Sequence, residues 1–223
     1  MIHTMYLKHG HNLLIFAFLT YGGPILLSSN RYLAFIFGIT LIHMIWTAGM
    51  NLLYGYTGLM PLMFAGIAGI SSYSLVGLMG MGWSFWLAMP ASAFIASIIG
   101  VGLGLPALRL KGFYFTLCSL VIQTVITLAF VYFVNFTNGD TGIAQIPQPG
   151  FGNGSVLQGL SYDLVLSTLA MLGMITLIWV IESPFGKKLI AIREDDDLAE
   201  TLGINVTRQK LTAFFIGSLF ASI

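Results

Sequence analysis

Charged residues are scarce in this chain, and their scarcity is the first limit on what kind of protein it is. Only 8% of its 223 residues are charged, whereas about a quarter of the residues of a soluble domain usually are. Apolar residues make up 57% of the sequence, which excludes an ordinary soluble domain. The net charge of +1 provides no basic surface for a nucleic acid.

Several chemical motifs are missing as well. Cys118 is the single cysteine, so no intrachain disulfide can form. The sequence contains no Gly-x-x-x-x-Gly-Lys-Ser/Thr motif, no metal-ligand cluster and no nucleophile paired with a base. We therefore expect no cofactor in this chain, and ATP, if it is used, must be bound by partner subunits. The central apolar segments contain no Asp, Glu, Lys or Arg beside His43, which argues against an ion-coupled carrier.

Long apolar runs dominate what is present. A helix needs about 20 mostly apolar residues to cross a bilayer, and it satisfies its backbone groups internally. The sequence thus predicts an all-α, polytopic membrane protein that forms a single domain over residues 1–223, with about six full transmembrane helices and a truncated seventh. The predicted spans are residues 12–28, 32–54, 61–80, 83–104, 113–133 and 163–181, and the truncated one starts at Leu211.

The two ends of the chain lead to separate expectations. The first span could be a signal peptide, but Pro24 interrupts it and residues 28–30 match a cleavage site poorly, so we expect an uncleaved helix. Residues 211–223 are too short to cross the membrane at about 1.5 Å per residue. We therefore expect the chain to stop inside a helix and to lack further spans, either as a fragment or as a natural truncation.

Lysine and arginine predict the orientation, because they accumulate on the cytoplasmic side. The segment 182–210, called the charged loop below, holds 11 of the 17 charged residues. If it is cytoplasmic, helix alternation places the linker 105–112 and the N-terminus on the same side, and the linker 134–162, which lacks Lys and Arg, outside. Eight of the nine basic residues then lie inside, with Arg31 as the exception. The sequence predicts a multi-pass protein of the cytoplasmic (inner) membrane.

The charged loop is predicted to form two short helices. Ser183-Pro184 is a helix start, and an apolar face follows at residues 185, 189 and 192. A second helix opens at residues 195–197, with Asp197 and Glu200 spaced as a capping box and Gly203 as its stop. Spacing alone leaves two functions open: docking into the groove of a partner, or simple anchoring of the topology.

Two polar stripes and one stripe of small residues mark the predicted spans. The polar stripes are candidates for the substrate path, with hydrogen bonding between helices as the alternative. Their members are Thr40, His43, Thr47 and Asn51 on one span and Thr116, Ser119, Gln123 and Thr127 on another. We count Asn51, Thr47 and the second set as candidate path residues. The small residues Ala88, Ser92, Ala96, Gly100 and Gly104 recur every four positions and predict close helix packing.

An ordered set of motifs resembles the permeases of branched-chain amino acid ABC transporters, in particular the larger, second permease of such systems. The motifs are Asn51-Leu-Leu-Tyr-Gly-Tyr-Thr-Gly58, Gly104-Leu-Pro-Ala-Leu-Arg-Leu-Lys-Gly112, Thr141-Gly-Ile143 before Ile146-Pro147, Ser183-Pro-Phe-Gly186, Ala191-Ile-Arg-Glu-Asp195 and the run from Leu202 to Leu211. The chain departs from the family at Leu59-Met60-Pro61-Leu62-Met63, where a polar Gln and small residues are usual.

The resemblance implies an importer built from a second permease subunit, two cytoplasmic ATPase subunits and an external substrate-binding protein. It implies that residues 184–205 dock onto an ATPase and that the linker 134–162 contacts the binding protein. The residues expected to couple to the ATPase are Arg193, Glu194, Asp195, Ala199, Glu200, Leu202 and Gly203.

The predicted function is therefore translocation of branched-chain or related hydrophobic amino acids by a non-enzymatic permease subunit. Three alternatives stay open at this point. The same architecture could import urea or short amides, the chain could be a secondary transporter or channel without an ATPase, or it could be an assembly remnant that does not transport.

Overall fold

The computed structural model describes residues 2–27, 30–144, 146, 149–150 and 159–223. All regular elements of these residues are helical, which confirms the all-α prediction. They are α1 (Ile2–Leu27), α2 (Arg31–Thr57), α3 (Phe64–Gly80), α4 (Phe85–Leu108), α5 (Phe113–Tyr132), α6 (Val134–Thr137), η1 (Gly139–Thr141), α7 (Leu160–Glu182), α8 (Pro184–Glu194), α9 (Asp196–Thr201) and α10 (Val206–Ser222).

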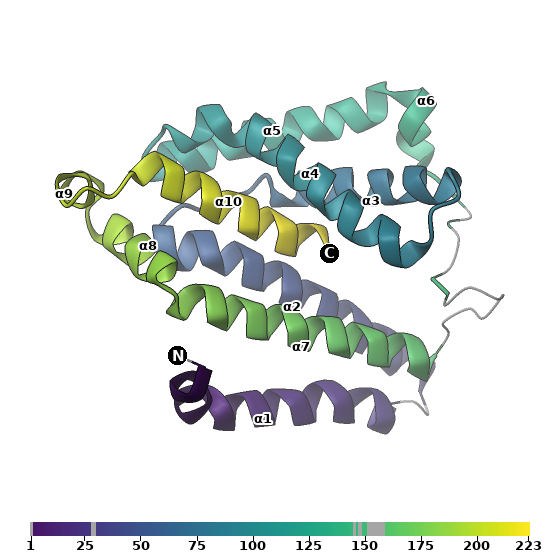
Figure 1. Ribbon diagram of the computed structural model, residues 1–223. Coiled ribbons are helices and arrows are strands. Elements are labelled where there is room, and N and C mark those ends of the chain that lie inside the picture. Colours follow the sequence, from purple (N-terminus) through teal and green to yellow (C-terminus); the bar gives the residue numbers. More distant parts are fainter. Residues whose placement is uncertain (1, 28–29, 145, 147–148, 151–158) are drawn as a thin grey trace.

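The long helices run back and forth across the molecule (Figure 1). Among the described residues, four helices are long and apolar enough to cross a membrane, namely α2, α4, α5 and α7. The other two predicted spans correspond to shorter apolar helices, α3 and the segment Leu13–Leu27 of α1. Many large apolar side chains on these helices are exposed, as expected for surfaces that face lipid. These features confirm the predicted polytopic membrane protein.

The predicted start of the last helix, at Leu211, is wrong. α10 begins at Val206 rather than at Leu211, because the side chain of Asn205 caps it by accepting a hydrogen bond from the backbone N–H of Arg208 at 2.9 Å. The helix then runs through the middle of the bundle, in contact with α2, α3 and α4 (Figure 1). The charged residues of its first turns therefore belong to the helix rather than to the loop before it.

Small residues let α10 approach its neighbours. A Cβ added at Gly49 of α2 would lie 2.7 Å from the carbonyl oxygen of Gly217, and one at Gly217 would lie 3.0 Å from that of Gly49, so the two backbones nearly touch. The predicted small-residue stripe of α4 is buried at all five positions. Its glycines face bulky neighbours: Gly100 lies against Ile67 of α3 and Gly104 against Phe214 of α10. Phe214 in turn packs edge-on against Phe64, with ring centroids 5.5 Å apart.

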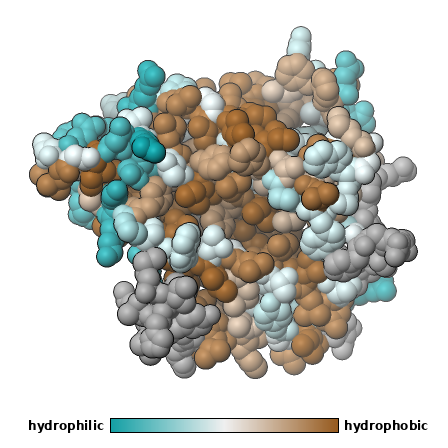
Figure 2. All heavy atoms as spheres, in the orientation of Figure 1, coloured by the Kyte–Doolittle hydropathy of each residue, from teal (hydrophilic) through white to brown (hydrophobic). Residues whose placement is uncertain are grey.

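The largest group of hydrophilic side chains lies at one end of the bundle. Figure 2 shows hydrophilic side chains over α8 and α9 and a broad apolar band across the middle of the same face. The turn between α4 and α5 and the start of α1 lie at that end, whereas α6 and the start of α7 lie at the opposite end (Figure 1). The alternation of the helices therefore groups the charged loop with the linker 105–112, as the distribution of basic residues suggested. Parts of the linker 134–162, including Pro147 of its motif, lie outside the described residues.

Candidate functional site

The charged loop folds into α8 and α9, and local sequence explains where α8 starts. Ser183 adopts an extended conformation and its hydroxyl accepts a hydrogen bond from the N–H of Gly186, while Pro184 occupies the first helical position. Leu189 and Ile192 are buried on the inner face of α8, which packs on α2, α7 and α10. α8 is therefore part of the folded bundle, and the predicted apolar face is the face that it buries.

The cap of α9 differs from the prediction. Asp195, not Asp197, is the N-cap residue: its carboxylate accepts hydrogen bonds from the N–H groups of Asp197 and Leu198 at 2.9 and 3.0 Å. The capping box of Asp197 and Glu200 is thus wrong, because the extended backbone already occurs two residues earlier and Asp197 lies within the first turn. The stop at Gly203 is confirmed, since its φ of +80° is in the left-handed region.

The end of α9 forms a Schellman motif. The N–H of Ile204 donates to the carbonyl oxygen of Ala199 and that of Gly203 donates to Glu200, at 3.1 and 2.9 Å. Ala199 is buried beneath the helix with Ile192 and Val206. On the outer side Leu198 and Leu202, one turn apart, are 59% and 71% exposed. These two residues, called the apolar tip below, present to solvent the kind of surface that usually fits a partner.

The seven predicted coupling residues lie together at this end but differ in what their side chains meet. Glu194, Glu200, Leu202 and Gly203 are exposed. Ala199 is buried, and Asp195 caps α9. Arg193 is directed back to the bundle, where its Nη1 donates to the carbonyl oxygen of Gly55 at 2.5 Å. Sequence reasoning did not single out Leu198, although its spacing to Leu202 was the available signal.

Two ion pairs fasten α9 to the bundle. Lys210 of α10 lies 2.6 Å from Asp196, and these side chains are only 6% and 18% exposed. Lys111, in the turn after α4, lies 2.8 Å from Asp197 in an exposed pair. The hydrogen bond with Lys111 holds the pKa of Asp197 below its ordinary value, and the same bond raises the pKa of Lys111. Neither partner was predicted, because 86 residues separate Lys111 from Asp197.

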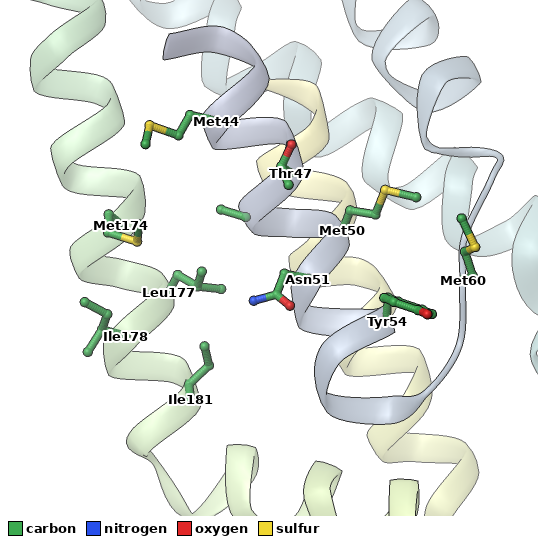
Figure 3. A pocket seen from close by; sticks show the side chains of 11 residues that line it. Met44, Thr47, Met50, Asn51, Tyr54, Met60, Met174, Leu177, Ile178 and Ile181 are labelled. Carbon is green, nitrogen blue, oxygen red and sulfur yellow. The ribbon is translucent and has the colours of Figure 1, made fainter. Parts of the chain in front are cut away.

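A groove of about 550 Å³ lies between α2 and α7, close to the charged loop. Figure 3 shows the carboxamide of Asn51 pointing from α2 toward α7, and Leu177 pointing back from α7. Most of the lining is apolar and includes methionines, which adapt to the shape of a ligand. The lining residues are Met44, Thr47, Ala48, Met50, Asn51, Tyr54, Met60, Met174, Leu177, Ile178 and Ile181. We call this cavity the α2–α7 groove.

The structure separates the two polar stripes. Thr47 and Asn51 line the α2–α7 groove, while His43 lies beside a smaller cavity of about 260 Å³ formed with α3 and α10. Thr40 and Thr47 each donate to a carbonyl oxygen one turn earlier in α2. The first stripe therefore does not act as one surface, and its two path candidates are brought together in the groove.

The stripe on α5 meets α3 instead of that groove. Ser119 accepts a hydrogen bond from the N–H of Leu62 at 3.1 Å, and Gln123 accepts one from the N–H of Gly66 at 2.6 Å. Since the first N–H groups of a helix have no partner within it, Gln123 caps α3 from a neighbouring helix, while Ser119 holds the backbone of Leu62 just before that helix. Thr116 accepts from Ser119 through its carbonyl oxygen, and Thr127 bonds to Gln123. Hydrogen bonding between and within helices thus accounts for the contacts of Ser119 and Gln123.

An all-helical bundle with lipid-facing apolar surfaces, a groove between two helices and a charged loop at one end has the features of a membrane transport protein. Residues 32–223 match the family described as the permease component of branched-chain amino acid transport systems, and the chain belongs to that family. No solved structure matches the chain.

Curated relatives agree with this assignment. The chain is 30% identical to the high-affinity branched-chain amino acid transport system permease protein LivM of Salmonella typhimurium, over 207 residues that cover 82% of this chain and 49% of the relative. The LivM protein of Escherichia coli matches with the same identity and coverage. The probable LivM protein of Methanocaldococcus jannaschii is 24% identical over 61% of this chain and 39% of its own length. The chain spans about half the length of the LivM proteins from the two bacteria. These relatives are named as transport permeases.

Proposed function

We propose that this chain is a permease subunit of an ATP-driven ABC importer that carries branched-chain or related hydrophobic amino acids across the cytoplasmic membrane. The subunit performs no covalent chemistry and holds no cofactor. Its partners are a second permease subunit, two cytoplasmic ATPase subunits and an external binding protein. The N-terminus and the charged loop face the cytoplasm. Family membership supports the substrate class, because the matching relatives are named for branched-chain amino acid transport.

One observation carries the coupling part of the proposal. The apolar tip of α9 exposes two leucines at the end of the molecule where the hydrophilic side chains over α8 and α9 lie. The two leucines form one apolar face of α9, and a helix that presents residues i and i+4 fits an apolar groove of a partner. In this proposal the ATPase subunit supplies that groove, and Leu198 and Leu202 are the contact.

The α2–α7 groove is the proposed path for the solute. Its methionine and isoleucine side chains suit an aliphatic side chain, and the amide of Asn51 can both donate to a carboxylate and accept from an ammonium group. The other path candidates, Thr116, Ser119, Gln123 and Thr127, remain candidates along α5. Movement of the groove between outward and inward access would follow closure of the ATPase dimer.

The first test is co-purification from native membranes. We expect ATPase subunits to accompany the unmodified chain and to be lost from the double variant L198D/L202D, while α9 keeps its caps. M81D is the matched control, because Met81 is an apolar residue at least as exposed (78%) but lies in the turn between α3 and α4 at the opposite end. Retention of the ATPase subunits by L198D/L202D would exclude the apolar tip as the coupling contact.

Uptake competition then tests the substrate. We expect unlabelled leucine to compete with labelled leucine in cells that carry the complete transporter, and urea to have no effect. Competition by urea and not by leucine would show that the proposed substrate class is wrong. It would leave the proposed importer architecture unaffected.

A further inference from the structure

α8 touches both walls of the α2–α7 groove. At one end it continues from α7 through the turn at Ser183. That turn is tight, because a Cβ at Gly186 would lie 2.0 Å from the carbonyl oxygen of Ile181, so only glycine fits. At the other end Arg193 reaches α2 and donates to the carbonyl oxygen of Gly55 at 2.5 Å. α8, 11 residues long, thus bridges the ends of the two helices that form the groove.

The contact of Arg193 is chemically suited to the end of α2. The last carbonyl groups of a helix have no N–H partner within it and carry the negative end of the helix dipole. A guanidinium placed there provides both a hydrogen bond and a favourable charge. The chain then turns at Gly58, whose φ is +72° and whose added Cβ would lie 3.6 Å from Cγ of Arg193. Arg193 therefore packs along the final turn of α2.

The same turn of α2 positions the polar group of the groove. A Cβ at Gly55 would lie 2.3 Å from Oδ1 of Asn51, so the carboxamide of Asn51 occupies the space above Gly55. Gly55 therefore contacts both residues: its carbonyl oxygen accepts the hydrogen bond from Arg193, and the side chain of Asn51 packs against it. A displacement of α8 at this contact moves the backbone that supports Asn51, the only carboxamide among the described residues that line the α2–α7 groove.

We propose that Arg193 is a positioning residue, which ties α8 to the end of α2 and so sets both the position of Asn51 and the separation of α2 from α7. This proposal rests on the proposed function, and it gives Arg193 a different task from contact with an ATPase. Motion of the charged loop would first displace α8. Arg193 would transmit this displacement to the backbone of Gly55, and Gly55 would shift the carboxamide of Asn51 beside the solute. α7 joins α8 covalently, whereas α8 meets α2 only through side-chain packing and the hydrogen bond of Arg193, so the contact with α2 is the one that can be released.

A distance measurement tests the tie without any substrate. Nitroxide labels at Tyr54 of α2 and Trp179 of α7, both more than half exposed, report the separation of the walls in the purified permease in lipid nanodiscs after Cys118→Ser. We expect R193A to broaden and shift the distance distribution. R193K should restore it, because only one N–H of Arg193 is used and a lysine ammonium can donate the same bond. R208A is the control, since this substitution removes the same charge from an exposed position in the first turn of α10.

Transport kinetics provide the second readout. Loss of a hydrogen bond from a charged group changes an equilibrium by about tenfold or more, so we expect R193A to raise KM for leucine about tenfold. The effect should be smaller in an N51A background, because the part of it that passes through Asn51 is then lost. A distance distribution for R193A that equals that of R208A overturns the proposal, and so does an R193A effect that adds in full to that of N51A.

The outcomes separate the two proposals. Altered distances in R193A, together with no leucine uptake by the unmodified transporter, support the tie and contradict the proposed function. Leucine uptake together with unaltered distances contradicts the tie alone.

Discussion

At the scale of single residues, Gly55 leaves open the space that Asn51 fills. We expect G55A to push the carboxamide of Asn51 aside, because the added Cβ would lie 2.3 Å from its Oδ1 and a side-chain end yields more easily than backbone. Stability should not fall, since alanine favours a helix over glycine by about 1 kcal/mol. Leucine binding to the transporter should weaken to the level of N51A, measured by equilibrium binding of labelled leucine.

G77A is the matched control for that prediction, because a Cβ at Gly77 of α3 meets nothing within 4 Å. We expect G77A to bind leucine as the unmodified protein does. If G55A weakened binding further in an N51A background, the effect of Gly55 would not pass through Asn51.

The pair of Lys111 and Asp197 predicts a pH dependence. The pKa of Asp197 is lowered from 3.8 and that of Lys111 is raised from 10.5, mainly by their mutual hydrogen bond. The contribution of Asp197 is present above its unfolded pKa and is lost as pH falls through the lowered value. That of Lys111 is present below its unfolded pKa and is lost as pH rises through the raised value. The link is therefore intact between about pH 4 and pH 10.

A nitroxide at Glu200 of α9 reports this link. We expect its mobility to be low at neutral pH and to rise only as pH falls through the lowered pKa of Asp197, below 3.8, where its carboxylate becomes protonated. In D197N the label should already be mobile at pH 7. The free energy that this ion pair contributes is small, because both side chains are exposed and salt screens their charges. Equal mobility of D197N and the unmodified chain at pH 7 would show that the pair does not hold α9.

At the scale of elements, the ion pair of Lys210 and Asp196 joins α10 to α9 from a largely buried position. K210M removes one partner and leaves the carboxylate of Asp196 uncompensated, which costs about 3 kcal/mol for a buried pair. We expect a lower unfolding temperature, measured by thermal denaturation in detergent. The double variant K210M/D196L removes both charges and should recover most of the loss. Equal destabilisation by the single and the double variant would indicate that packing, not charge, is the cause.

At the scale of the whole molecule, the helix alternation groups the charged loop on one side and α6 on the other. The distribution of lysine and arginine predicts that the charged loop is cytoplasmic. In a Cys118→Ser background, we expect a membrane-impermeant maleimide to label N135C on intact cells and to leave K188C unlabelled. Both positions are exposed, so accessibility is matched. Labelling of K188C and protection of N135C would reverse the orientation.

The sequence by itself determined that the protein lies in a membrane, that it is helical, and where several of its helices begin or end. Long apolar runs suffice for the first two, since a bilayer requires length and composition rather than particular contacts. The start of α8 at Ser183 and the stop of α9 at Gly203 were predictable because a cap depends on residues within one turn. The opening of α9 at residues 195–197 was predicted, but its cap was assigned to Asp197 instead of Asp195, because all three residues are aspartates and each can cap a helix.

Tertiary structure alone decided which polar side chains line a cavity and which hold helices together. Helical spacing placed Asn51 and Gln123 on polar faces, but it does not say what a face meets: Asn51 borders the α2–α7 groove and Gln123 caps α3. It also decided that Arg193 contacts Gly55 across 138 residues of sequence. Such contacts depend on how helices far apart in the chain pack against one another, and no local pattern encodes that geometry.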